Sequence, residues 1–155
     1  MSIRGRIFFI ILSCLFIGLS LAFVVAERDL SEGLQQQIES ELSKQAKILR
    51  QSFAESPKVN NSSSLKSQID SYSDASGSRI TLIARDGKVL VDSDIAMDVL
   101  ESLDNHSNRP EVIAAFNNGS GSSKRFSNST QQDMLYFALL DTTSEAERVI
   151  RISVT

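Results

Sequence analysis

Near its start the chain has a run of twenty uncharged residues, 7–26, whose polar members are Ser13, Cys14 and Ser20. A helix rises about 1.5 Å per residue, so this run extends about 30 Å, which matches the hydrocarbon thickness of a bilayer. The hydroxyl groups can donate hydrogen bonds to carbonyls of their own helix. The pattern therefore predicts a transmembrane helix over residues 7–26.

The charges that flank this run predict its orientation. Arg4 and Arg6 precede it, whereas residues of mixed sign follow it. Basic residues gather on the cytoplasmic side, so we expect residues 1–6 in the cytoplasm and residues 27–155 outside it. A cleaved signal peptide and a buried helix of a soluble protein are the alternatives. A retained anchor is favoured because the apolar core of a signal peptide usually has only about 7–15 residues.

Residues 27–56 have apolar positions at steps of four and three, which indicates a long helix with one apolar face. That face could pack on a sheet, or part of it could contact a second copy of the chain. The two interpretations are compatible if the two halves of the helix differ. We therefore expect the first half to form a homodimer contact and the second half to join a core. The predicted dimer contact consists of Leu30, Leu34, Ile38 and Leu42, and the predicted core positions are Ala46, Leu49 and Phe53.

Turn residues divide the rest of the chain. Pro57 ends the long helix, a polar connector covers residues 60–64, and a short helix follows with Leu65, Ile69 and Tyr72 on one side. Two short apolar runs, 80–83 and 89–91, then flank an Asp-Gly pair, the favoured sequence for a tight hairpin turn. The region 78–155 is therefore expected to contain a sheet.

Residues 94–109 are polar and irregular, with a helical turn expected near residues 97–100. Arg109-Pro110-Glu111 then predicts a helix start, because proline suits the first helical position. We expect its inner face to consist of Val112, Ile113 and Phe116. Three antiparallel strands are predicted beyond it, at 123–127, 134–140 and 149–154. The predicted fold class is α+β, a five-stranded antiparallel sheet with helices against one face.

Composition excludes several classes of function. The single cysteine, Cys14, lies within the apolar run, and the chain has one histidine, so a disulfide and an ordinary zinc site are not expected. Without Arg4 and Arg6 the chain carries 14 basic and 19 acidic residues, with both signs interspersed. This balance argues against nucleic acid as a partner. No cofactor is predicted.

Candidate chemistry is limited to a few polar clusters. Acidic residues near 92–104 could hold a cation, but their spacing fits no calcium-loop pattern, so no metal site is predicted. No nucleophile is paired with a base, so no catalytic residue is predicted either. Ligand-binding candidates are the residues that could line a pocket between the sheet and the irregular segment, with structural roles such as capping as the alternative: Arg79, Asn105, His106, Arg109 and Tyr136.

Three segments, 78–93, 104–112 and 133–138 with its partner 149–153, resemble the extracytoplasmic region of bacterial sensor histidine kinases. The second, Asp-Asn-His-Ser-Asn-Arg-Pro-Glu-Val, is similar to a stretch in the phosphate-regulon sensor kinase and its cell-wall-control relatives. The resemblance implies a PAS-like or Cache-like domain on a long helix, held between two membrane spans. His106 would lie outside the cytoplasm, so it is not the phosphorylated histidine.

The kinase core of that family has no counterpart in these residues. We therefore expect the chain to be a fragment or a truncated product, itself not an enzyme, whose two-pass parent would reach a response regulator only through the missing core. The expected function is sensing a small-molecule or protein signal outside the membrane. Alternatives are the sensor half of a chemoreceptor or diguanylate cyclase, and a binding domain that is anchored by one span and complete as it stands.

Overall fold

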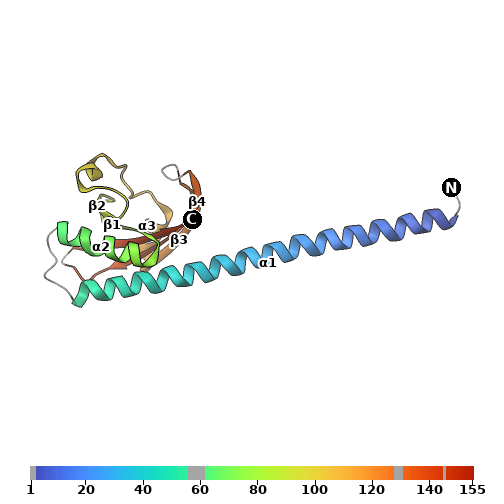
Figure 1. Ribbon diagram of the computed structural model, residues 1–155, viewed down its shortest axis with the longest axis horizontal. Coiled ribbons are helices and arrows are strands. Elements are labelled where there is room, and N and C mark those ends of the chain that lie inside the picture. The colour runs from blue at the N-terminus through green and yellow to red at the C-terminus, as the bar shows by residue number, and fades with distance from the viewer. Residues whose placement is uncertain (1–2, 56–61, 128–130, 145) are drawn as a thin grey trace. The chain divides into compact units, whose positions relative to one another are not determined.

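The computed structural model describes residues 3–55, 62–127, 131–144 and 146–155. By contacts the chain divides into two units, residues up to Ile38 and residues Glu39–Thr155. The helix α1, Ile3–Glu55, supplies the described part of the first unit and the first residues of the second (Figure 1). Pro57, the predicted end of the long helix, and residues 60–61 of the predicted connector lie outside the described residues, whereas residues 62–64 belong to the next helix, Ser62–Ser76, and not to a connector.

In the first unit, α1 exposes its apolar side chains, Phe16 and Phe23 among them. The Ser13 hydroxyl donates to the Phe9 carbonyl oxygen at 2.9 Å, so this polar group is satisfied within the helix as expected. Within the described residues, α1 is the single helix that is long and apolar enough to cross a membrane; a signal sequence near the N-terminus would meet the same test.

A five-stranded antiparallel sheet is the centre of the second unit, and its strand order is β2-β1-β5-β4-β3. The last strand along the chain thus lies between β1 and β4. The strands are β1 (Arg79–Ala84), β2 (Val89–Asp92), β3 (Ser120–Ser127), β4 (Gln132–Asp141) and β5 (Arg148–Val154). This arrangement confirms the predicted fold class.

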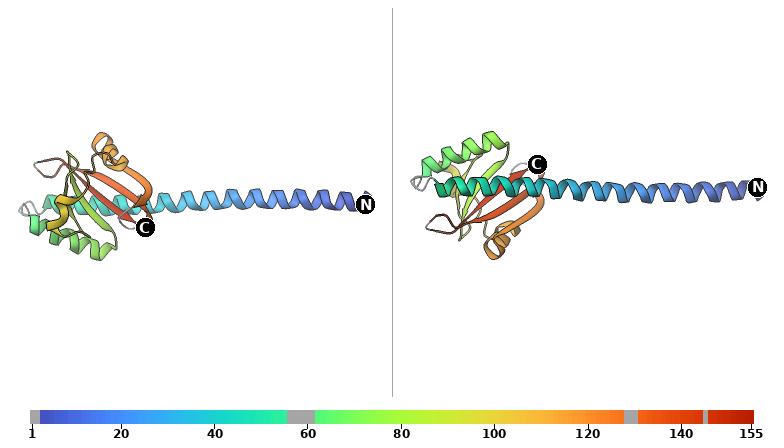
Figure 2. Two further views of the ribbon diagram at one scale, coloured as in Figure 1. Left: turned by 90° about the horizontal axis from the view of Figure 1, so that it is seen from above. Right: turned by 90° about the horizontal axis from the view of Figure 1, so that it is seen from below.

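Helices cover both faces of the sheet, whereas the sequence led us to expect them on one (Figure 2). Residues 39–55 of α1 and the helix α2, Ser62–Ser76, pack on one face. The helix α3, Pro110–Asn118, packs on the other, against Ile83, Ala138 and Val149. Because successive strand residues point to opposite faces, each strand can supply both cores.

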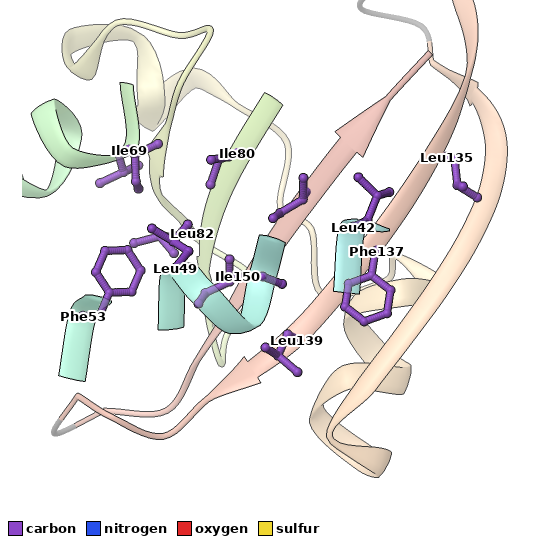
Figure 3. Packing of buried hydrophobic residues seen from close by; sticks show 13 residues of the cluster. Leu42, Leu49, Phe53, Ile69, Ile80, Leu82, Leu135, Phe137, Leu139 and Ile150 are labelled. Carbon is purple, nitrogen blue, oxygen red and sulfur yellow. The ribbon is translucent and has the colours of Figure 1, made fainter. Parts of the chain in front are cut away.

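The larger core lies under α1 and α2 (Figure 3). Burying an aliphatic or aromatic side chain contributes about 1.5–3 kcal/mol, so this cluster is the main source of stability in the unit. Its residues are Leu42, Ala46, Leu49, Phe53, Ile69, Ile80, Leu82, Val91, Leu135, Phe137, Leu139, Ile150 and Ile152.

The helix α1 differs from the expected dimer pattern at one position. Leu30, Leu34 and Ile38 are 66%, 53% and 40% exposed, but Leu42 is 1% exposed. Leu42 is buried against the sheet of its own chain, so it is not available to a partner. The change from exposed to buried apolar positions occurs between Ile38 and Leu42.

The hairpin of β1 and β2 forms as predicted, and Gly87 turns it with φ of +86°. In α3, however, Ile113 was predicted to face inward but is 45% exposed. Ala115, which was not predicted to face inward, is buried instead. The strand β3 begins at Ser120, three residues earlier than expected. A Cβ on Gly121 would lie 2.4 Å from the Ala114 Cβ, so glycine allows this strand to pack closely beneath α3.

Candidate functional site

A cavity of about 320 Å³ lies on the α3 face of the sheet, between the strands and the segment that follows β2. That segment contains a short 3₁₀ helix, η1 (Met97–Ser102), and ends where α3 begins. The lining residues are Arg79, Ile95, Leu103, Asp104, His106, Arg109, Arg125, Phe126, Ser127, Tyr136 and Arg151.

The sheet wall of the cavity follows from strand register. Arg79 and Tyr136 are each paired with Ser153, one from each side, so all three share a face. In the next row Thr81 is opposite Arg151. Side chains two residues apart on a strand point to the same face, so these two rows form one polar surface.

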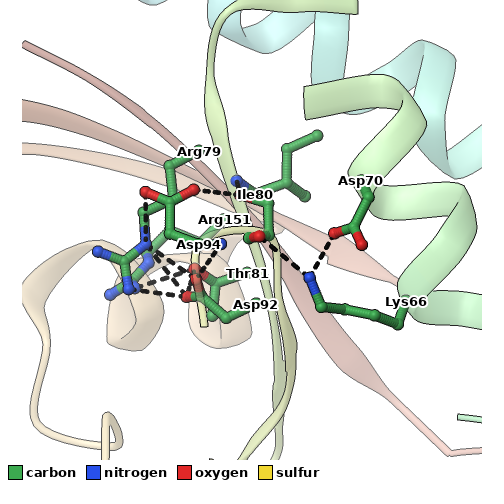
Figure 4. A network of polar contacts seen from close by, with 9 residues as sticks. Lys66, Asp70, Arg79, Ile80, Thr81, Asp92, Asp94 and Arg151 are labelled. Atoms are coloured by element: carbon green, nitrogen blue, oxygen red, sulfur yellow. Dashed lines mark hydrogen bonds and ion pairs between the residues drawn. The ribbon is translucent and has the colours of Figure 1, made fainter. Parts of the chain in front are cut away.

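Arg79 is held in place by acidic residues at the end of β2. Its Nε lies 3.0 Å from Asp92 Oδ1, and its second terminal nitrogen lies 3.0 Å from Asp92 Oδ2 (Figure 4). Asp92 is fully buried and also accepts a hydrogen bond from the Thr81 hydroxyl at 2.8 Å. A bidentate pair of this kind fixes the guanidinium plane. Arg79 is therefore a paired, positioned group of the wall.

Glu111, in the first turn of α3, is the second buried acid of the site, with 0% exposure. It accepts a hydrogen bond from the Ser123 hydroxyl at 2.6 Å and pairs with Arg125 at 3.2 Å and Arg151 at 3.6 Å. Burial raises the pKa of this carboxyl, but its hydrogen bonds with Ser123 and its own backbone N–H, together with both arginines, lower the pKa below its ordinary value. The group is thus an anion shared by two cations.

Tyr136 lies close to the same two arginines. The Arg125 guanidinium carbon is 4.0 Å from the centre of the tyrosine ring, and that of Arg151 is 5.2 Å away. Such cation–π contacts are attractive and restrict how the guanidinium groups turn. Arg151 is 4% exposed, and burial lowers its pKa to about 10, which leaves it charged at neutral pH.

The opposite wall is the loop that carries His106 and Arg109, and it is tied to the hairpin turn. The Asn105 amide donates to the Asp86 carbonyl oxygen at 2.8 Å, and the His106 backbone N–H donates to the Gly87 carbonyl oxygen at 2.9 Å. A Cβ on Gly87 would lie 2.2 Å from Asn105 Oδ1. The loop therefore keeps its place only while residue 87 has no side chain.

His106 is half-buried, and its Nδ1 has no partner among the described residues. Burial, followed by the charges of Arg151, Arg109 and Arg125, lowers its pKa to about 4, against an opposite effect of Asp92. The imidazole is therefore neutral at ordinary pH and adds a polar but uncharged group to a wall of cations.

A model of the single Cache-like family matches residues 33–154, most of the chain. The chain belongs to the Single Cache-like family. No curated protein matches it in sequence. Cache-like domains are typical of extracytoplasmic sensors, so this one has a sensing role outside the cytoplasm. Together with the candidate apolar helix, the family is consistent with a membrane location. The matched model describes a sensor module and includes no catalytic domain.

Four of the five predicted ligand-binding residues of the Cache-like domain line the cavity: Arg79, His106, Arg109 and Tyr136. Asn105 does not line it. Its side chain is exposed and holds the loop to the hairpin instead, accepting also from the Ser107 N–H at 2.8 Å. This anchoring agrees with the structural alternative considered for the segment.

Sequence reasoning missed three charged residues of the Cache-like domain, namely Arg125, Arg151 and Glu111. A signal for Arg151 was present, because a charged residue between Ile150 and Ile152 shows that the second face of that strand is polar. No comparable signal marked Glu111, since an acid in the first turn of a helix is ordinarily a solvated residue.

The chemistry of the cavity follows from these groups. Guanidinium and imidazole nitrogens bind oxyanions, and the lining carries four arginines. Among the described residues, no group of three or more His, Cys, Asp or Glu side chains could hold a metal ion. The arrangement suits binding of an anionic small molecule and offers no nucleophile that is activated by a base.

Proposed function

We propose that the chain is the extracytoplasmic input region of a membrane-bound sensor histidine kinase that responds to phosphate or envelope signals, and that the cavity is its sensory site. One observation carries the sensing part of the proposal. The strands that line the cavity also form, through their alternate residues, the core under α1 and α2. The kinase part rests on the resemblance of segments 78–93, 104–112 and 133–138.

The central strand β5 is the shortest route between the two faces. Arg151 lies in the cavity wall, while its neighbours Ile150 and Ile152 are buried in the core with Leu49. A ligand that moves Arg151 must also move these neighbours. A ligand that binds one packing of sheet against helix more tightly than another would shift the population toward it, and α1 would then report the occupancy.

A second route runs from the end of β2 to α2. Lys66 on α2 donates to the Ser93 carbonyl oxygen at 3.0 Å and to Asp70 at 2.5 Å (Figure 4). Ser93 directly follows Asp92, the partner of Arg79. A change at the arginine wall would thus reach α2 through two neighbouring residues.

For the membrane part we propose a cytoplasmic N-terminus, a span at residues 7–26 and a homodimer. The exposed apolar positions Leu30, Leu34 and Ile38 would form the dimer contact. Leu42 is left out, because it is buried in its own domain.

Cysteine cross-linking of the chain in native membranes tests the sensing mechanism. In a Cys14→Ser background, Leu34→Cys should form disulfide-linked dimers, and Gln36→Cys, which is placed on another face of the helix, should not. Adding Arg109→Ala, which changes the cavity wall, should alter the Leu34→Cys yield. Arg85→Ala is the matched control, because Arg85 is an exposed arginine that pairs with Glu147 outside the cavity. Equal yields in both backgrounds would contradict coupling between cavity and helix.

Reading the gene past codon 155 tests the output. A second apolar run followed by a histidine box and ATP-binding motifs is expected for the kinase. A methyl-accepting region or a cyclase domain would keep the sensing role and overturn the kinase. A stop codon at that point would favour an anchored binding domain.

A further inference from the structure

The cavity wall carries more positive than negative charge. Four arginines line it, Arg79, Arg109, Arg125 and Arg151, whereas the buried carboxylates that pair with them are two, Asp92 and Glu111. The buried groups therefore leave two positive charges without a buried counter-charge. Uncompensated charge in a partly buried site is costly, so an anionic ligand would relieve it.

The excess belongs to Arg109, Arg125 and Arg151, because Arg79 has acidic partners of its own. Asp92 holds Arg79 through both carboxylate oxygens, and Asp94 lies 3.8 Å from the same guanidinium. Arg125 and Arg151, by contrast, share the single carboxylate of Glu111. Arg109 forms no ion pair with any acid in the described part of the chain.

Unused hydrogen-bond donors are found on the same three arginines. The Nε atoms of Arg109, Arg125 and Arg151 are buried and have no partner among the described residues. Buried donors are ordinarily satisfied, so these three arginines have hydrogen-bonding capacity that the described residues do not use. Arg79 differs, because its Nε donates to Asp92.

Two features keep these donors in position. The ring of Tyr136 contacts the guanidinium groups of Arg125 and Arg151, and Glu111 pairs with both from the α3 side. The cavity volume of about 320 Å³ is near the lower limit for small-molecule sites, which is about 300–1,000 Å³. Asp104 also lines the cavity, but it is exposed and water screens its charge.

From this charge excess, these donors and this volume, we propose that the ligand is a compact oxyanion with two negative charges, held by Arg109, Arg125 and Arg151. Inorganic phosphate and a short dicarboxylate share this chemistry. The proposal rests on the cavity being the sensory site, as proposed above, and adds the class of ligand that it recognises.

Calorimetric titration of the full chain in detergent micelles at pH 8 and low chloride tests the ligand class. The probes are inorganic phosphate, sulfate and succinate as dianions, and acetate as the monoanion. At least one dianion should bind about tenfold or more tightly than acetate, because a second charged hydrogen-bonding group is engaged. Phosphate and sulfate bound more tightly than succinate would identify a tetrahedral oxyanion, and the reverse order a dicarboxylate.

Variants assign the binding to the cavity. Arg109→Gln should weaken the preferred dianion by about tenfold or more, since it removes the cation without a buried partner. Arg85→Gln is the control and should leave the affinity unchanged. Acetate bound as tightly as every dianion, binding of none of the four probes, or equal affinities in the two variants would overturn the proposal.

Cross-linking separates this proposal from the proposed function. Dianion binding without any change in the Leu34→Cys yield would leave the ligand class standing and refute the sensing route. If Arg109→Ala changes the yield while no dianion binds, the sensing route stands and the ligand class is refuted.

Discussion

The two faces of the sheet are built from alternate residues of the same strands, yet their chemistry is opposite. Ile150 and Ile152 lie in an apolar core under α1 and α2, whereas Arg151 between them lines a cavity with three other arginines. The first face holds the larger core, and the second, beside its smaller core under α3, holds charges whose burial is costly. The domain thus has its larger apolar core and its arginine-lined cavity on opposite sides of one sheet.

Removing the buried acid of the polar face should have the largest effect. Glu111→Gln should lower the free energy of unfolding by about 3–5 kcal/mol, because it leaves Arg125 and Arg151 without their shared anion. Urea unfolding of the chain in micelles, followed by fluorescence of its two tyrosines, measures this change. Glu147→Gln, at an exposed pair with Arg85, should cost about 0–1 kcal/mol. Similar costs for both variants would contradict the role of Glu111 as the shared buried counter-charge of Arg125 and Arg151.

A cavity made in the apolar face should lower the free energy of unfolding by a similar amount, with a wider expected range. Leu49→Ala should cost about 2–5 kcal/mol, because Leu49 is 0% exposed in the core. Its neighbour Ile48, 57% exposed on the same helix, is the matched control, and Ile48→Ala should change stability by less than about 0.5 kcal/mol. Equal costs for Leu49→Ala and Ile48→Ala would contradict the placement of Leu49 in the core.

The glycines at two turns allow a narrower test of the polar face. Gly87 and Gly119 have φ of +86° and +87°, but only at Gly87 would a Cβ meet other atoms within 4 Å. Gly119→Ala should cost about 1–2 kcal/mol for its backbone alone. Gly87→Ala should cost more, because it also displaces the loop that carries His106 and Arg109. Thermal unfolding of the two variants measures the difference in stability. Equal losses of stability would show that the loop can move away from a side chain at residue 87 at no cost.

The last expected effect concerns pH dependence and is seen as a slope of stability against pH. The pKa of His106 is about 4 in the folded chain and 6.5 as its ordinary value, so the unfolded chain takes up a proton first as the pH falls. The free energy of unfolding should therefore decrease from pH 6.5 toward pH 4. His106→Gln should flatten this slope between pH 7 and pH 5, since the chain has no other histidine. Urea midpoints across that range provide the measurement, and an unchanged slope would contradict the burial of the imidazole.

Local patterns predicted much of the apolar face and less of the polar one. The Asp-Gly turn and the helical spacing of Leu49 and Phe53 are short-range signals, and both correspond to the structure. The placement of α3 on the second face was not predicted, because Val112 is apolar whichever face its helix covers. Glu111 was missed for a related reason: its burial depends on Arg125, a residue from a different element.

The central position of β5 has a consequence for how the chain is made. If residues 27–155 cross the membrane during synthesis, the hairpin of β1 and β2 and the pair of β3 and β4 emerge before the strand that joins them. Until β5 arrives, the facing edges of β1 and β4 are unpaired, and the core under α1 lacks Ile150 and Ile152. Open strand edges are sites of aggregation. Secretion rate and chaperone supply would therefore affect the yield of this domain in addition to its final stability.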